Sequence, residues 1–432
     1  MPILLILYAL IFLVIGLNAA SRIRTPDDFF VAGRRGNSLH ITASLLATIL
    51  GSSAILGTIA MAETAGSAAV WLLISGAAGL TALLPLAKYV RRYGRFTLPE
   101  LLETFYGQTV KRTASAMIPL AWTGVIAVQV IGSAKILAYL TPLSYHPAAV
   151  LCGTAFILYT VLGGQLSIFR TDYLQLGFIV TGLLFAVTAA RQAHPDIALF
   201  TPNFPFNTEF SPWDLMVLFL TYASLFTVGP DIYSRLFCAR NEQSAFFSVL
   251  LTAALMIPAA LALTVIGVTG AQHSFEFLTS GPLPFIIGIG LLSAVISSAD
   301  TTLLTAAAIS GGVCRDIHQH SSLALTRWLI LVFGAISTVI ALAFPRIIPT
   351  LMLAFSFFSG AFIIPTIAGL LGYRAGTGQV MTAIVSGGTL ALTGKILTLT
   401  GLPVIGNSVI ISAFPVNALI LFLPRKIFSL KK

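Results

Sequence analysis

The stretch Ala294-Val295-Ile296-Ser297-Ser298-Ala299-Asp300-Thr301-Thr302 places two serines, an aspartate and two threonines inside a long apolar segment. That segment runs from about residue 284 to 312 and can cross a bilayer as a helix, because about 20 residues suffice. Positions three and four apart stack on a helix, so Ser297, Ser298 and Thr301 share one face with Ala294, and Asp300 lies at its edge. An ionisable residue at membrane depth is costly and usually functional, and a stripe of oxygen atoms suits a hard cation. The alternative is that these hydroxyls bond to backbone carbonyls or hold helices together.

The composition of the whole chain excludes a soluble globular protein. Of the 432 residues, 57% are hydrophobic and only 9% are charged. Because segments long enough to span a bilayer recur along the chain, the sequence predicts an all-α polytopic membrane protein surrounded by lipid. We count thirteen apolar segments, at residues 3–20, 39–62, 68–90, 113–139, 147–163, 171–190, 212–234, 245–269, 284–311, 326–344, 347–372, 378–398 and 404–424.

The distribution of lysine and arginine predicts the orientation of the chain. If the N-terminus lies outside, 20 of the 24 basic residues fall in cytoplasmic stretches, as the positive-inside rule requires. Arg235 and Arg240 make up one such stretch, after the seventh segment. Thirteen crossings then place the C-terminus in the cytoplasm. The net charge of +10 is thus explained by topology rather than by nucleic-acid binding.

Two of the apolar segments look interrupted. The second contains Gly51-Ser52-Ser53, and the seventh contains Thr227-Val228-Gly229-Pro230. Glycine and proline weaken a helix, and free backbone carbonyls at membrane depth are tolerated only where they line a cavity. The two breaks are five crossings apart, so the broken helices run in opposite directions, which is typical of the inverted repeats of secondary transporters. The alternative is that Gly and Pro are simply common in membrane helices.

Three further motifs resemble those of the sodium:solute symporter family. They are Asp28-Phe29-Phe30-Val31-Ala32-Gly33-Arg34 after the first segment, Tyr159-Thr160-Val161-Leu162-Gly163-Gly164, and Thr171-Asp172-Tyr173-Leu174-Gln175. The stretch from Ala294 to Thr305 is similar to the family's sodium-site helix. The resemblance runs along the whole chain, and the family includes proline, sugar, sialic acid and pantothenate carriers. The motifs define the family and leave the solute open.

The resemblance implies a leucine-transporter-type fold of about 13 transmembrane helices in a single domain. Residues 1–38 would form an extra N-terminal helix and a cytoplasmic loop. Residues 39–190 and 212–372 would form two inverted five-helix repeats. Residues 378–432 would add two C-terminal helices and a tail.

The resemblance also implies a Na⁺ site. In the family, backbone carbonyls of the first broken helix and hydroxyls of the ninth helix hold the ion. Carried over by position, the ligands are the carbonyls of Ala47, Leu50 and Ala294 and the hydroxyls of Ser297 and Ser298.

Some members of the family have a second cation site, in which an aspartate of the sixth helix joins oxygens of the ninth. Asp172 matches that aspartate, while Asp300 and Thr301 stand where those members carry small hydroxyl residues. The set Asp172, Asp300 and Thr301 could therefore hold a second cation. Two carboxylates close together also raise the pKa of one of them, so that it could stay protonated. A proton-coupled variant therefore remains open. The plainer interpretation of Asp172 is an interfacial residue paired with Arg170 or another neighbour.

The same fold would place the solute between the two breaks. Candidate substrate-binding residues are Ser52, Ser53, Ala54, Gln129, Tyr222, Leu225, Phe226 and Phe357. Phe355, Phe357 and Phe358 either form a hydrophobic gate or pack against lipid and protein. The sequence pattern indicates no buried basic residue that is placed to bind a carboxylate. Lys135 is the basic residue well inside a span, and its side chain is expected to extend toward the outer interface.

These features together predict a secondary active transporter that carries a small organic solute, such as an amino acid, sugar or organic acid, with Na⁺ by alternating access. Na⁺ would be the coupling ion, with no organic cofactor, and the location would be the plasma (inner) membrane. A proton-coupled transporter is the first alternative. A membrane solute sensor acting through a partner is the second. An enzyme is not predicted, because no Ser/His/Asp or HExxH arrangement occurs.

Overall fold

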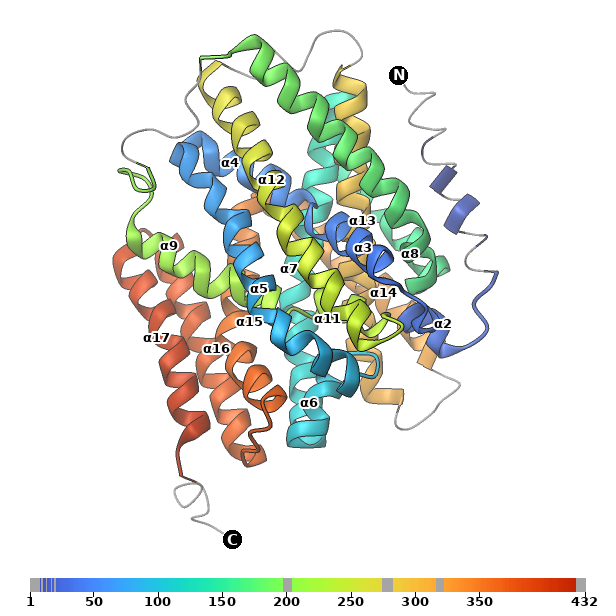
Figure 1. Ribbon diagram of the computed structural model, residues 1–432, viewed down its shortest axis with the longest axis vertical. Coiled ribbons are helices and arrows are strands. Elements are labelled where there is room, and N and C mark those ends of the chain that lie inside the picture. The colour runs from blue at the N-terminus through green and yellow to red at the C-terminus, as the bar shows by residue number, and fades with distance from the viewer. Residues whose placement is uncertain are drawn as a thin grey trace.

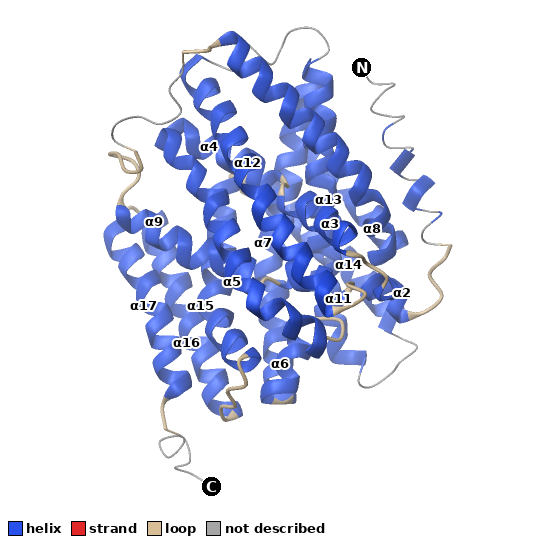
Figure 2. Cartoon of the chain, viewed as in Figure 1, coloured by secondary structure: helices blue, strands red, loops and turns tan. Residues whose placement is uncertain are grey.

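The computed structural model describes residues 21–196, 204–273, 283–315 and 322–424, together with positions 8, 11, 12, 14–16 and 18. The described residues fold into an elongated bundle of helices joined by short connections (Figures 1 and 2). Ten helical stretches among them are long and apolar enough to cross a membrane. The prediction of an all-helical membrane protein is confirmed, while most of the predicted first segment lies outside the described residues.

The helices follow the predicted apolar segments closely. Their bounds are α2 Pro26–Val31, α3 Ser38–Ile49, α4 Ser52–Ala65, α5 Val70–Tyr93, α6 Leu98–Tyr106, α7 Gln108–Leu140, α8 Tyr145–Ala193, α9 Pro212–Leu218, α10 Ser224–Val228, α11 Pro230–Phe237, α12 Glu242–His273, α13 Leu283–Arg315, α14 Ser322–Ala343, α15 Ile347–Leu370, α16 Thr377–Leu399 and α17 Pro403–Phe422. Short 3₁₀ turns follow α2 and α4, and a π-helical turn, η3, covers Phe219–Ala223 between α9 and α10.

The first predicted break is present between α3 and α4. Leu50 and Gly51 leave the helical conformation, with ψ angles of 38° and −168°. The backbone N–H of Ser52 donates to the Gln129 side chain at 3.2 Å, and that of Ala54 donates to the Gly51 carbonyl at 3.1 Å. In a regular helix these two amides would bond to the carbonyls of Thr48 and Leu50. The break therefore releases backbone oxygens in the interior of the bundle.

The second predicted break is also present, between α10 and α11. Gly229 is extended, with φ −61° and ψ 133°, and Pro230 opens α11. Proline suits the first position of a helix because its missing N–H would have no helical partner there. The sequence did not indicate the π-helical turn η3 that precedes α10.

Two predicted spans, 147–163 and 171–190, follow one another within α8. They meet at Gly164, whose φ of +53° and ψ of −166° interrupt the helix. A Cβ atom at Gly164 would collide with the buried ring of Phe29 from α2. Two of the motifs noted in the sequence thus pack on each other, and the turn requires glycine for both its backbone and its space.

We expect Gly164→Ala to lower the melting temperature by several degrees. A left-handed backbone costs a residue with a Cβ atom about 1–2 kcal/mol, and the displaced Phe29 ring adds to that. Thermal unfolding of the purified protein in detergent measures the effect. Gly177→Ala is the matched control, since Gly177 lies in the same helix and no atom of the described residues comes within 4 Å of its Cβ position. Equal melting temperatures of the two variants would contradict this account.

Helices α7 and α13 form the centre of the bundle, because 78% of the most apolar window of each is buried. Both pack against α8 and α14, and α13 also contacts α3 and α4 at the first break. Helices α16 and α17 pack on each other and on α15, and they lie at the lower left of the bundle (Figure 1). The polar stretch of α13 is therefore held in the interior, beside the break between α3 and α4.

Candidate functional site

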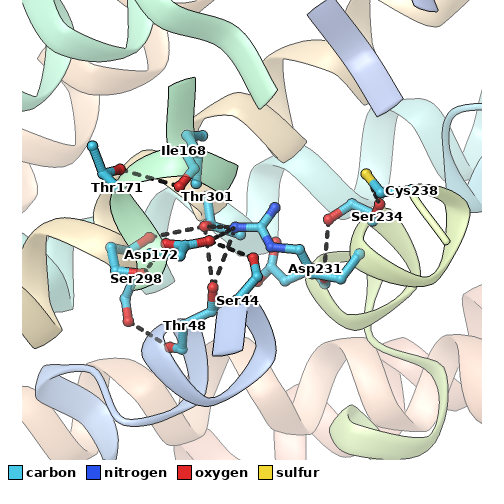
Figure 3. Close-up of polar contacts among 12 residues, drawn as sticks. Ser44, Thr48, Ile168, Thr171, Asp172, Asp231, Ser234, Cys238, Ser298 and Thr301 are labelled. Carbon is cyan, nitrogen blue, oxygen red and sulfur yellow. Dashed lines mark hydrogen bonds and ion pairs between the residues drawn. The ribbon is translucent and has the colours of Figure 1, made fainter. Parts of the chain in front are cut away.

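Asp172 of α8 lies at the centre of a polar cluster beside the first break (Figure 3). Its side chain is fully buried. One carboxylate oxygen accepts a hydrogen bond from Ser297 of α13 at 2.7 Å, and the other accepts a short one from Ser44 of α3. The interpretation of Asp172 as an interfacial residue paired with Arg170 is therefore wrong. The motif aspartate joins three helices in the interior.

The hydroxyl groups of α13 reach the backbone oxygens that the break releases. The Ser298 side chain donates a short hydrogen bond to the Thr48 carbonyl of α3. Gly51 allows this approach, because a Cβ atom there would overlap the Ser298 side chain. Ala47 and Ala294, two further positions of the predicted Na⁺ ligand set, are also fully buried on these two helices. Neutral oxygens from α3 and α13 are thus gathered at one place.

Arg235 of α11 is the site residue that sequence reasoning missed. The sequence counted it only among the basic residues that follow the seventh segment, and its side chain is fully buried in the cluster. Its Nη2 atom donates to Thr48 Oγ1 at 3.2 Å and to Thr301 Oγ1 by a short bond, and it lies 3.8 Å from Asp172 Oδ2. A count of basic residues treats every arginine after an apolar segment as a loop residue. Here α11, which begins after the break at Gly229, packs against α3 and α13, and this packing buries the side chain.

Asp300 lies on a different face of α13 from Ser297 and Thr301. It is buried and accepts a hydrogen bond from Thr160, in the first half of α8, at 3.1 Å. Of the predicted second-cation set, the structure joins Asp172 and Thr301 through Arg235, while Asp300 bonds to Thr160 instead.

The candidate substrate residues fall into separate groups. Ser52 of α4 and Gln129 of α7 are both buried and bond to each other at 2.7 Å, so they join these two helices. Tyr222, Phe226 and Phe355 form an aromatic cluster, with Tyr222 centroid distances of 5.0 and 5.6 Å to the two phenylalanines. Ser53 and Leu225 are partly exposed, whereas Ala54 is fully buried.

Phe357 lies apart from that aromatic cluster. It lines a cavity of about 530 Å³ between α7, α15 and α16, together with Thr123 and Gly124. Its neighbours Phe355 and Phe358 are buried and pack inward, the latter against Trp122 with a centroid distance of 4.9 Å. Both of these side chains thus pack against protein rather than lipid.

A second cavity, of about 440 Å³, opens beside the first break. It is bounded by α4, α7, α8, α12 and α13 and is largely apolar. Ile55 and Leu56, about one turn beyond Gly51 in α4, line it, and so do the exposed side chains of Glu63, farther along α4, and of Lys135 in α7. Lys135 is thus exposed, as the sequence suggested, and it faces this cavity.

The opposite end of the bundle, where α6 and α11 lie, is closed by several contacts (Figure 1). Trp122 of α7 donates its indole N–H to both oxygens of Asp231 in α11, at 3.0 and 2.8 Å. Farther along, Gly36 pairs through its backbone with Cys238 and Arg240 at 3.0 and 2.8 Å. The molecule is therefore asymmetric, with a cavity on one side of the break and packed side chains on the other.

Comparisons with known proteins identify the class and then the family. A solved structure of a Na⁺-coupled sialic acid symporter matches with a TM-score of 0.75 and 18% identity, over 96% of this chain and 97% of that one. A nucleobase-cation-symport-1 family transporter matches with a TM-score of 0.59 and 13% identity, over 95% and 97%. A manganese transporter from Eremococcus coleocola matches with a TM-score of 0.60 and 13% identity, over 92% of this chain and 96% of that one. The fold is therefore that of the leucine-transporter class of membrane transporters, as predicted.

The family model of the sodium:solute symporter family matches residues 29–279, which is more than half of the chain. The chain belongs to the sodium:solute symporter family. It is thus a multi-pass membrane transporter that couples solute movement to sodium, and not an enzyme. The predictions of family, transport class and coupling are confirmed, while the individual ligands remain predictions.

Proposed function

We propose that Na⁺ binds at the break between α3 and α4 and is carried inward with a small organic solute. The ligands would be the carbonyl oxygens of Ala47, Leu50 and Ala294 and the hydroxyls of Ser297 and Ser298. The observation that carries this proposal is the contact of the Ser298 hydroxyl with the Thr48 carbonyl. It brings α13 hydroxyls and released α3 carbonyls within one hydrogen bond of each other, and such neutral oxygens suit Na⁺.

The cavity beside the break supports a path for the solute. It reaches Ile55 and Leu56 next to the proposed ion site, while Trp122 and Asp231 hold the other end together. If the N-terminus lies outside, this cavity faces the outside, and the structure corresponds to an outward-facing state. The similar sialic acid symporter has been captured substrate-bound and outward-open. The largely apolar lining favours a solute with an apolar part.

The two inverted repeats of the proposed transporter would be residues 39–190 and 212–372. Their relative movement would expose the site to each side of the membrane in turn. Residues 378–432 would supply two peripheral helices and a tail. The protein would reside in the plasma (inner) membrane with a cytoplasmic C-terminus. The solute would contact residues beside the two breaks, among them Ser53 and Leu225.

The first test is the melting temperature of the purified protein in NaCl against matched choline chloride. Na⁺ at ten times its dissociation constant should stabilise the folded protein by ~1.4 kcal/mol, which is a shift of a few degrees. We expect Ser298→Ala to abolish the shift. Thr302→Ala should keep it, because the buried Thr302 hydroxyl bonds only to carbonyls of its own helix, at 2.9 and 3.1 Å.

Two results would count against this proposal. A Na⁺ shift that survives in Ser298→Ala would place the ion elsewhere. Stabilisation by lower pH in choline chloride, without any response to Na⁺, would instead support proton coupling.

A further inference from the structure

The guanidinium of Arg235 lies where a second cation would be expected. Its Nη2 atom contacts oxygens from three helices, namely Thr48 of α3, Thr301 of α13 and Asp172 of α8. Asp172 and Thr301 are two of the three residues that the sequence suggested for a second cation. The place is therefore already filled by a positive charge that belongs to the chain.

The geometry of this contact differs from that of an ordinary buried salt bridge. Arginine usually meets a carboxylate through two nitrogens in a forked arrangement. Here a single nitrogen makes all three contacts, and the buried Nε and Nη1 atoms of Arg235 have no hydrogen-bond partner among the described residues. The guanidinium thus presents one positively charged corner to a ring of oxygens, much as a bound ion would.

The charge balance of the cluster also indicates that Arg235 takes the place of a bound cation. A buried carboxylate is stable only when a positive charge and hydrogen bonds accompany it. Asp172 already has two serine donors, and the guanidinium of Arg235 supplies the positive charge. A Na⁺ ion at the same oxygens would lie next to the guanidinium and would be repelled.

We propose that Arg235 is the resident cation of the Asp172 site, so that Na⁺ does not bind there and the transporter holds a single Na⁺, at the break. This inference rests on the proposed Na⁺ site beside Ser298. It assigns Arg235 a role in fixing the ion stoichiometry, with Asp172 and Thr301 as its partners rather than ligands of a transported ion.

The test is the number of ²²Na⁺ ions that the purified full-length protein binds at saturation, measured by equilibrium dialysis. The wild type should bind one ion per chain. Arg235→Gln should bind two, because it vacates the oxygens and leaves Asp172 negative. The double variant Asp172→Asn/Arg235→Gln should return to one, as should Arg235→Lys, which keeps the positive charge.

Arg92→Gln is the matched control for loss of an arginine. Arg92 is exposed and pairs with Glu242 at 2.8 Å on the surface, so this variant should bind one ion. Two ions bound to the wild type or to Arg235→Lys would overturn the inference. One ion bound to a folded Arg235→Gln would overturn it as well. Each of these results would leave the proposed function intact. Should Arg235→Gln fail to fold, the wild type and Arg235→Lys still decide between one ion and two. No Na⁺ bound to any variant, the folded wild type included, would instead refute the proposed function.

Discussion

Gly51→Ala should weaken Na⁺ binding by about a hundredfold. Gly51 has φ −78° and ψ −168°, a conformation that alanine also adopts, so the effect comes from space alone. An added Cβ atom would overlap the Ser298 side chain and push α13 away from the break. Loss of one or two charge-assisted contacts costs about 3 kcal/mol, which is about a factor of 100 in affinity. Titration of the melting temperature with NaCl measures the change.

Gly57→Ala is the matched control for this substitution. Gly57 lies farther along α4, and in the part of the chain that the structure describes its added Cβ atom would meet only a methyl group of Leu72 at 3.5 Å, which is ordinary van der Waals contact. This variant should keep the affinity of the wild type. If Gly51→Ala kept it as well, close contact between the break and α13 would not matter for the ion.

Trp122→Phe should shift the molecule toward opening at the end that α6 and α11 close. The indole N–H bonds to both oxygens of Asp231, and phenylalanine keeps much of the ring packing on Phe358 while removing this donor. A hydrogen bond to a charged group contributes about 1.5–3 kcal/mol, so opening should become roughly 10- to 100-fold more frequent.

The native thiol of Cys238 reports this opening, because it is free and fully buried at the end of α11. In a Cys152→Ser/Cys314→Ser background, Trp122→Phe should speed alkylation of Cys238 by N-ethylmaleimide in proportion to the opening. Trp71→Phe is the control, since no described residue accepts a hydrogen bond from the buried Trp71 indole N–H. Equal alkylation rates in the two variants would show that the Trp122–Asp231 contact does not hold this end closed.

Much of the architecture could be predicted because membrane helices leave strong local signals. The apolar segments predicted the positions of the helices. Gly51 and Gly229-Pro230 predicted both breaks, since few other residues interrupt a helix at membrane depth. The family motifs gave the transporter class, and the Asp172 motif proved to be an interior site.

The parts that could not be predicted depend on tertiary contacts. The burial of Arg235 follows from the path of α11 after the break, which hydropathy does not record. The pairing of Asp300 with Thr160, rather than with the Asp172 cluster, depends on the rotation of α13 against α8. Phe357 lines the cavity of about 530 Å³, whereas Tyr222 packs on Phe226 and Phe355, because the face that a helix turns toward a site is set by its neighbours.

The cavity of about 440 Å³ also bears on how the membrane voltage acts. Water in this cavity would extend the conducting solution to Ile55, so most of the electrical potential would fall across the packed layer between the break and Asp231. A sodium ion would then cross little of the field while it binds and most of it when the other end opens. The voltage, which contributes about 2.3 kcal/mol per charge per 100 mV, would therefore act on the conformational step rather than on capture of the ion.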